Sequence, residues 1–251
     1  MIPVWLSGLA WAYISVCLAC AGIIAGDILI GRRRQPMGVM NFVFPITALY
    51  FGPLALAFYW RWARVPARTP AMAAMPAMAG APEPGPAGGP SDNSKKRRSR
   101  PRPGWVTMAI ETSHCGAGCS LGDLIAEFVI FWLALSVAGL ALGAEFIGDY
   151  LVALAFGIVF QYFAIAPMRG LGLKDGLVAA TKADFISLTA FEIGLFGWMA
   201  VFQLVLFTGS SSLMPDSAAY WLLMQVGMMI GFATSWPANV WLVRKGIKVP
   251  M

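Results

Sequence analysis

Apolar residues along this chain gather into six long stretches separated by shorter polar segments. A helix needs about 20 residues to cross a bilayer, and each stretch reaches or approaches that length. The stretches are Val4–Gly26, Met40–Trp60, Leu121–Leu142, Tyr150–Met168, Phe185–Phe207 and Ala219–Val243. Apolar side chains lie all the way round each of them, whereas strands of a membrane barrel would show shorter alternating segments. The pattern predicts an all-α fold, a polytopic transmembrane helical bundle of six spans.

A segment of different composition separates the second predicted span from the third. Residues 67–104 are rich in Pro, Ala, Gly and Met and include the basic run Lys95–Arg102. Such a segment has no apolar core to bury, which predicts a disordered linker. The linker divides the chain into an N-terminal transmembrane hairpin, residues 1–66, and a four-helix transmembrane domain, residues 105–251.

The composition supports a membrane protein and excludes a soluble domain. Hydrophobic residues make up 59% of the chain and charged residues only 12%, whereas soluble domains carry about 25% charged residues. The lipid bilayer is therefore the first expected partner, with a second membrane protein or another copy of the chain as further possibilities. The net charge of +6 is interpreted as an orientation signal, because the basic run contains no aromatic residues that would stack on nucleic-acid bases. No nucleic-acid partner is expected.

Basic residues remain on the cytoplasmic side of a membrane, so their positions predict the orientation. Most of them lie in the linker, the fourth-to-fifth loop and the C-terminal segment, which predicts that both termini and the linker are cytoplasmic. The run Arg32–Arg34 disagrees, since it would then lie outside. Pro45 and the Gly52–Pro53 pair leave an alternative open, in which the second segment is re-entrant and the N-terminus lies outside.

The segment Ser113–Phe128 holds the most unusual group of reactive side chains. These are His114, Cys115, Cys119, Asp123 and Glu127. Imidazole and thiolates suit copper or zinc, whereas carboxylates suit iron or manganese, so the group predicts a transition-metal site. Gly116 and Gly118 would let a loop fold back; if the helix begins earlier, the side chains four residues apart share one stripe. The alternative is that the cysteines pack as small apolar residues, since the spacing matches no standard zinc pattern.

A second group of polar residues lies within or beside the apolar stretches. A charge at the centre of a membrane helix costs about 3 kcal/mol, so such residues often mark function. Besides Glu127, the group comprises Lys182, Asp184, Glu192 and Asn239. Glu127 and Glu192 lie deepest, and three roles are open for them: metal ligands, members of a proton or ion pathway, or hydrogen-bonded packing residues. Lys182 and Asp184 lie near the interface, and Asn239 follows the helix-kinking Pro237, where packing is the default role.

Three long strings resemble a bacterial family of uncharacterised membrane proteins, domain-of-unknown-function family 4396. The strings are SHCGAGCSLGDLIAEF, FGIVFQYFAIAPMRGLGLKDGLVAATKADFISLTAFEIGLFGWM and MMIGFATSWPANVWLVRKGIKVPM, within residues 112–251. The resemblance implies a four-helix domain in a bacterial inner membrane and includes all of the polar residues named above. Some members are labelled copper oxidase, so the resemblance also favours copper as the metal.

These observations lead to three functional hypotheses. The first is a membrane protein that binds or handles copper, with His114, Cys115 and Cys119 as ligands assisted by the acidic residues. The second is a structural or accessory subunit of a larger membrane complex, because the phosphate-binding, metalloprotease and serine-hydrolase motifs are missing from the sequence. The third is a proton or ion pathway. Whether the chain is an enzyme stays open.

Overall fold

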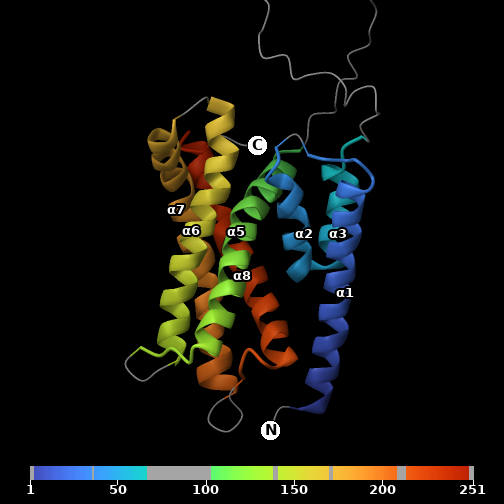
Figure 1. Cartoon of the computed structure of the whole chain (residues 1–251), viewed down its shortest axis with the longest axis vertical. Coiled ribbons are helices and arrows are strands. Elements are labelled where there is room, and N and C mark those ends of the chain that lie inside the picture. The colour runs from blue at the N-terminus through green and yellow to red at the C-terminus, as the bar shows by residue number, and fades with distance from the viewer. Residues whose placement is uncertain are drawn as a thin grey trace, which may run out of the picture.

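Long helices dominate the computed structural model, which describes residues 3–35, 37–66, 103–137, 141–169, 172–207 and 213–248 (Figure 1). Five helices are long and apolar enough to cross a membrane, and the described residues contain no β-strand. The five are α1 (Val4–Leu29), α5 (Gly104–Trp132), α6 (Ala141–Arg169), α7 (Leu173–Val201) and α8 (Ala218–Arg244). The all-α, multi-span prediction is confirmed. The linker predicted at residues 67–104 lies outside the described residues except for its last two positions.

The second predicted span, Met40–Trp60, is broken, so the prediction of six continuous spans is wrong. It forms α2 (Met40–Phe51), α3 (Pro53–Phe58) and a final wide turn, η1 (Tyr59–Ala63). The break lies at Gly52, whose φ of 53° and ψ of −121° suit only glycine, and Pro53 then starts the next helix. The 12 residues of α2 extend about 18 Å, well short of the roughly 30 Å hydrocarbon core.

Polar contacts hold the end of this re-entrant hairpin, residues 40–63, beside the end of α1. Arg64 Nη2 lies 2.6 Å from Asp27 Oδ1, and the Tyr59 hydroxyl donates to Asp27 Oδ2 over 3.0 Å. Arg33 Nη1 donates to the Val65 carbonyl over 3.0 Å. The chain therefore descends along α2 and returns to the level of Asp27, where α1 ends, as Figure 1 shows.

The structure places the start of α1 and the end of α8 at opposite ends of the bundle, called lower and upper here as in Figure 1. This differs from the prediction that both termini share a side and corresponds to the alternative topology. Every described lysine and arginine belongs to a segment at the upper end or in the upper half of a helix. They are Arg32, Arg33, Arg34, Arg61, Arg64, Arg169, Lys174, Lys182, Arg244, Lys245 and Lys248.

Helix α5 begins well before the predicted span Leu121–Leu142, and its glycines pack closely against α6. A methyl group on Gly118 would lie 3.0 Å from Cα of Gly157, and one on Gly122 would collide with the backbone of Ala153. These glycines therefore let α5 and α6 approach closely, as small residues do in membrane helix pairs. The interpretation of Gly116 and Gly118 as part of a folded-back loop is wrong, because both lie within the helix.

Candidate functional site

Helix α5 carries a line of buried reactive side chains through the middle of the bundle. Successive members are four residues apart and so are neighbours on the helix surface: Glu111, Cys115, Cys119, Asp123 and Glu127. All five are at most 1% exposed. The 16 residues between the first and the last correspond to about 24 Å of helix. The line therefore extends over most of the thickness of a bilayer core, about 30 Å.

A buried lysine, Lys248, lies beside Glu111 at the upper end of the line. Lys248 Nζ lies 3.1 Å from Glu111 Oε1 and 3.7 Å from Asp184 Oδ1, and it donates to Asn239 Oδ1 over 3.0 Å. The chain turns back after α8 at Gly246, whose φ is 69°, and this turn brings the lysine inside. Burial lowers the pKa of Lys248, but the two carboxylates outweigh that effect and raise the pKa above its ordinary value. We call Lys248, Glu111, Asp184 and Asn239 the upper ion cluster.

Thiol and hydroxyl groups lie in the middle of the line. Cys115 Sγ is 3.4 Å from Ser187 Oγ, and the Ser187 hydroxyl lies 3.3 Å from Asp184 Oδ1 and 3.0 Å from the Asp184 backbone carbonyl, both of which accept from it. One turn further along α5, Cys119 lies beside Cys115 and Glu192. The middle segment therefore connects the upper ion cluster with the carboxyl groups below it through side chains that carry exchangeable protons.

Five buried carboxyl groups gather in the lower half of the bundle. They come from α5, α6 and α7, and we call them the lower acid cluster: Asp123, Glu127, Glu145, Asp149 and Glu192. Asp123 interacts electrostatically with Glu192 and Glu127, and Asp149 interacts with all three. No ion pair with any of these acids occurs among the described residues. Like charges gathered in a dry interior cannot all be ionised, so the cluster must hold protons.

The oxygens of this cluster have few partners. Gln203 Nε2 donates to Glu145 Oε2 over 2.9 Å. Glu127 lies beside Asp149 and the Tyr220 hydroxyl, yet neither of its oxygens has a hydrogen bond of good geometry within the described residues. The same holds for both carboxyl oxygens of Asp123, Asp149 and Glu192. Buried polar atoms are normally satisfied, so unpartnered ones in a group of this size indicate a functional constraint.

A cavity reaches the cluster from the lower end of the bundle. Its volume is about 280 Å³, and Glu127 and Glu145 line it together with Ser136, Met214 and Pro215 from the lower connections. Most of the lining is apolar, but the volume is large enough for several water molecules, and Glu145 and Ser136 offer polar groups to them. This cavity therefore connects the lower acid cluster with the lower end of the bundle. The ion-paired side chains of the upper ion cluster, by contrast, are fully buried.

The predicted metal ligands do not converge. His114 lies against Phe160 of α6, with ring centroids 6.2 Å apart, whereas Cys115 contacts Ser187 of α7. Throughout the described part of the chain, no three His, Cys, Asp or Glu side chains are grouped as a metal ion requires. The residues therefore do not fit a copper centre in this arrangement, and copper binding stays a prediction from the sequence.

The remaining predicted residues divide between the core and the surface. Asp184 and Glu192 are buried beside α5, and Asn239 binds Lys248 and donates to the Ser235 carbonyl. Lys182 is exposed on α7 and takes no part in the line. All of the acids and thiols nominated from the sequence are therefore inside the bundle, while Lys182 lies on its surface.

Sequence reasoning missed five members of the site: Glu111, Glu145, Asp149, Ser187 and Lys248. The four-residue spacing of Cys115, Cys119 and Asp123 reaches Glu111 when it is extended one step back, and Glu145 and Asp149 have the same spacing. Those two acids lie between the predicted spans Leu121–Leu142 and Tyr150–Met168, which predicts a loop, whereas the structure places both on α6. Lys248 was counted only as an orientation signal, and nothing in its local sequence shows that it turns inward.

Comparison with known protein families supports treating these helices as a unit. A family model described as a domain of unknown function, DUF4396, matches residues 104–248, which is more than half of the chain. The chain belongs to the DUF4396 family. The DUF4396 segment contains all of α5 to α8 and therefore every residue of the line, the upper ion cluster and the lower acid cluster. Neither the curated proteins nor the solved structures include a match to the chain.

Proposed function

We propose that this DUF4396 protein conducts protons across the membrane along the buried polar column of α5. The polar column comprises the line on α5, the upper ion cluster, Ser187 and the lower acid cluster. The single observation that carries the proposal is the set of unpartnered, fully buried carboxyl groups halfway through a membrane bundle. Intramembrane acids of this kind are costly and serve as proton relays in pumps and transporters.

The route begins at the lower end of the bundle. Water in the cavity would exchange protons with Glu145, which interacts in turn with the buried Glu127. The proton then passes to Asp149, Asp123 and Glu192, each of which lies near another member of the cluster. Each transfer between carboxyl groups breaks one O–H bond and forms another, and transfers that involve the thiols exchange O–H and S–H bonds, so no redox partner is needed. The acids share protons because only some of them can be ionised at once.

The upper half of the route uses weaker proton carriers. Cys119 lies beside Glu192. Cys115 Sγ is 3.4 Å from Ser187 Oγ, and Ser187 Oγ is 3.3 Å from Asp184 Oδ1. Lys248 holds Asp184 and Glu111 as ion-paired groups. Its positive charge repels a further proton, so the upper ion cluster is the main electrostatic barrier along the route.

The test is proton flux into liposomes that contain the purified protein and an internal pH-sensitive dye. A potassium diffusion potential set by valinomycin drives the flux. We expect wild-type protein to acidify the interior and Asp123→Asn to reduce the flux to that of empty liposomes. Asp175→Asn is the matched control, because it makes the same change at an exposed position on α7 and should conduct normally.

A restoring variant separates loss of the carboxyl group from loss of folding. Asp123→Glu keeps a carboxyl group in the cluster and should recover part of the flux, provided that both variants elute as single species in detergent. Flux in Asp123→Asn equal to wild type would overturn the proposal, as would wild-type flux no greater than in empty liposomes.

We further propose that the upper end faces the cytoplasm of a bacterial inner membrane. The support is that every described lysine and arginine lies at that end or in the upper half of a helix, as the positive-inside rule expects once residues 40–63 are re-entrant. Single cysteines introduced at Ser7 and Lys245 in a cysteine-free background test this. A membrane-impermeant thiol reagent added to intact spheroplasts should label position 7 and leave position 245 unlabelled.

The other two functions derived from the sequence stay predictions. Metal analysis of purified protein, with and without Cys115→Ser and Cys119→Ser, tests copper binding. Co-purification under mild detergent tests an accessory role in a larger complex. Neither hypothesis is supported by a contact among the described residues, whereas the proton route is supported by the unpartnered acids.

A further inference from the structure

Five arginines gather around a single acid at the upper end of the N-terminal part of the chain, residues 1–66 (Figure 1). They lie in the connection after α1 and at the end of η1, and we call them the arginine cluster: Arg32, Arg33, Arg34, Arg61 and Arg64. Asp27 is the only acid in residues 1–66, which contain no lysine, so the side chains of this part carry a net charge of +4. This excess charge lies outside the DUF4396 segment, residues 104–248.

Two members of the arginine cluster share the carboxylate of Asp27. Arg64 Nη2 lies 2.6 Å and Arg33 Nε lies 3.4 Å from Asp27 Oδ1. Arg33 Nη1 also donates to the Val65 carbonyl over 3.0 Å, which brings the connection after α1 beside the end of η1. Both arginine side chains stay partly exposed, at 27% and 40%. One carboxylate balances only one of the two guanidinium groups, so this fixed pair keeps a positive charge at the surface.

The other three members of the arginine cluster have no acidic partner. Arg32, Arg34 and Arg61 are exposed and form no ion pair with an acid among the described residues. Arg61 lies over the Trp62 ring, 4.2 Å from its centroid. Trp62 in turn meets Trp105 edge to face, with ring centroids 5.6 Å apart. Tryptophans at the ends of membrane spans mark the level of the lipid headgroups, so the arginine cluster lies at that level.

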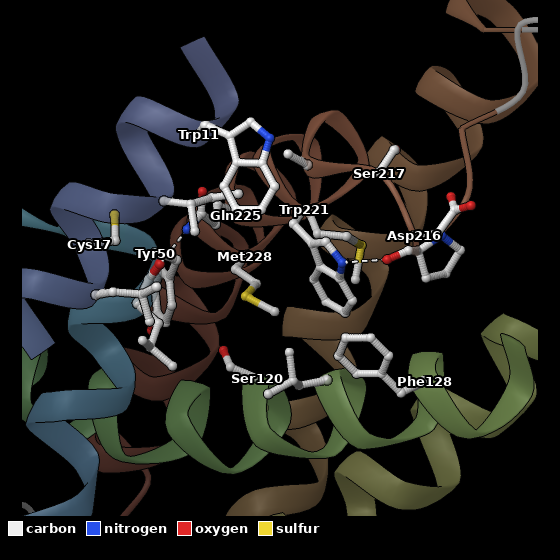
Figure 2. Close-up of a pocket in the computed structure, with 17 residues that line it drawn as sticks. Trp11, Cys17, Tyr50, Ser120, Phe128, Asp216, Ser217, Trp221, Gln225 and Met228 are labelled. Atoms are coloured by element: carbon white, nitrogen blue, oxygen red, sulfur yellow. Dashed lines mark hydrogen bonds between the residues drawn. The ribbon is translucent and has the colours of Figure 1, made fainter. Parts of the chain in front are cut away.

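An apolar groove begins at the same tryptophan rings. Its volume is about 210 Å³, and Trp105 and Leu54 line it together with Phe58 and Phe232. Trp105 and Leu54 are more than half exposed, so the groove opens on the outer surface of the bundle. A larger apolar cavity of about 370 Å³, shown in Figure 2, lies between α1, α2, α5 and α8 and has no basic residue in its lining. Of the two, the groove beside Trp105 is the one that adjoins positive charge.

The chemistry of these two neighbouring features selects an amphipathic anion. The planar fork of a guanidinium group matches two oxygens of a phosphate. A soluble phosphate would use the arginines alone, whereas a phospholipid would also place an acyl chain in the groove. We propose that the arginine cluster binds the phosphate of an anionic phospholipid whose acyl chain lies in the groove beside Trp105. This binding does not depend on the proton route.

Native mass spectrometry of the full chain tests the proposal. The protein is released from detergent micelles that contain equimolar dioleoylphosphatidylglycerol and dioleoylphosphatidylcholine, which have the same acyl chains and differ in net charge. We expect wild type to retain the phosphatidylglycerol preferentially. Arg32→Gln combined with Arg34→Gln should weaken phosphatidylglycerol binding by about fivefold for each arginine removed. Retention of phosphatidylcholine should not change.

A control pair of variants removes the same charge elsewhere at the upper end. Arg244→Gln combined with Lys245→Gln acts on exposed residues at the end of α8 and should leave phosphatidylglycerol binding unchanged. None of these four side chains forms an ion pair with a described acid, so both double variants should unfold at the wild-type temperature.

Glycerol 1-phosphate separates a lipid site from a site for soluble phosphate. It carries the phosphate without acyl chains, so at equal concentration it should not displace phosphatidylglycerol. Displacement by glycerol 1-phosphate would overturn the assignment to a lipid. Equal retention of the two lipids by wild type, or equal loss of phosphatidylglycerol in the two double variants, would overturn the role of the arginine cluster.

Discussion

Replacing Lys248 by methionine tests whether the upper ion cluster stabilises the bundle. The lysine side chain and both carboxylates are at most 1% exposed, and the ammonium lies 3.1 Å from Glu111 and 3.7 Å from Asp184. At an effective dielectric constant of about 20, these separations correspond to roughly 5 and 4.5 kcal/mol of attraction. Desolvation of the ammonium offsets several kcal/mol of that sum.

Replacing Lys248 should reduce the free energy of unfolding by more than the net stabilisation that its two ion pairs provide. The reason is that two buried acids are left without a cation. Removing one partner of a buried pair costs about 3–5 kcal/mol. For chains of this size such a loss lowers the midpoint of thermal unfolding by about 6–20 °C. Adding Glu111→Gln to Lys248→Met removes one stranded charge and should recover part of the loss, which a purely apolar packing defect would not show.

Thermal unfolding in detergent, followed by the loss of the monodisperse peak in size-exclusion chromatography, measures the effect. Lys245→Met is the matched control, since this lysine is exposed three residues earlier and its loss should change stability by less than about 0.5 kcal/mol. Equal unfolding temperatures for the two methionine variants would refute the role assigned to Lys248.

Three further predictions follow from the packing and from the pKa of Lys248. Gly122→Ala should unfold far more readily than Gly197→Ala, because a methyl group at Gly122 meets the backbone of Ala153 and one at Gly197 meets nothing within 4 Å; yield and unfolding temperature in detergent measure this. Gly52→Ala should cost about 1–3 kcal/mol, since its φ is 53° and Cys17 Sγ would lie 3.0 Å from the new methyl group; Gly38→Ala, with nothing within 4 Å, should be neutral in the same assay. The raised pKa of Lys248 contributes stability that is complete below the unfolded pKa, about 10.4, and is lost as the pH rises through the folded pKa. Wild type should therefore lose more stability than Lys248→Met between pH 9 and pH 11.5, and parallel losses would contradict the raised pKa.

The long apolar helices could be predicted from the sequence because lipid imposes a minimum length on them. The predicted starts of the spans at Val4 and Ala219 fall within one residue of the helices, where apolar character begins abruptly. The start of α5 was missed because residues 111–123 mix acids, thiols and glycines, which lowers local hydropathy. That mixture is tolerated because α5 is enclosed by its neighbours, and enclosure is a tertiary property.

The candidate site was only partly predictable for the same reason. Spacing along one helix identified Cys115, Cys119, Asp123 and Glu127, since residues four apart are neighbours whatever the rest of the fold does. The contribution of Asp149 depends on how α6 crosses α5. The contribution of Lys248 depends on a turn at Gly246 that brings a positive charge back inside the bundle.

The infrared spectrum of the reconstituted protein tests most directly whether the acids of the polar column hold exchangeable protons. A protonated carboxyl group has a C=O stretching band that a carboxylate lacks, and the band shifts when the proton is replaced by deuterium. We predict such a band for wild type at neutral pH, its shift on transfer to D2O, and its weakening in Asp123→Asn and Glu192→Gln but not in Asp175→Asn. A spectrum without the band, or a band that never shifts in D2O, would contradict a proton route through this bundle.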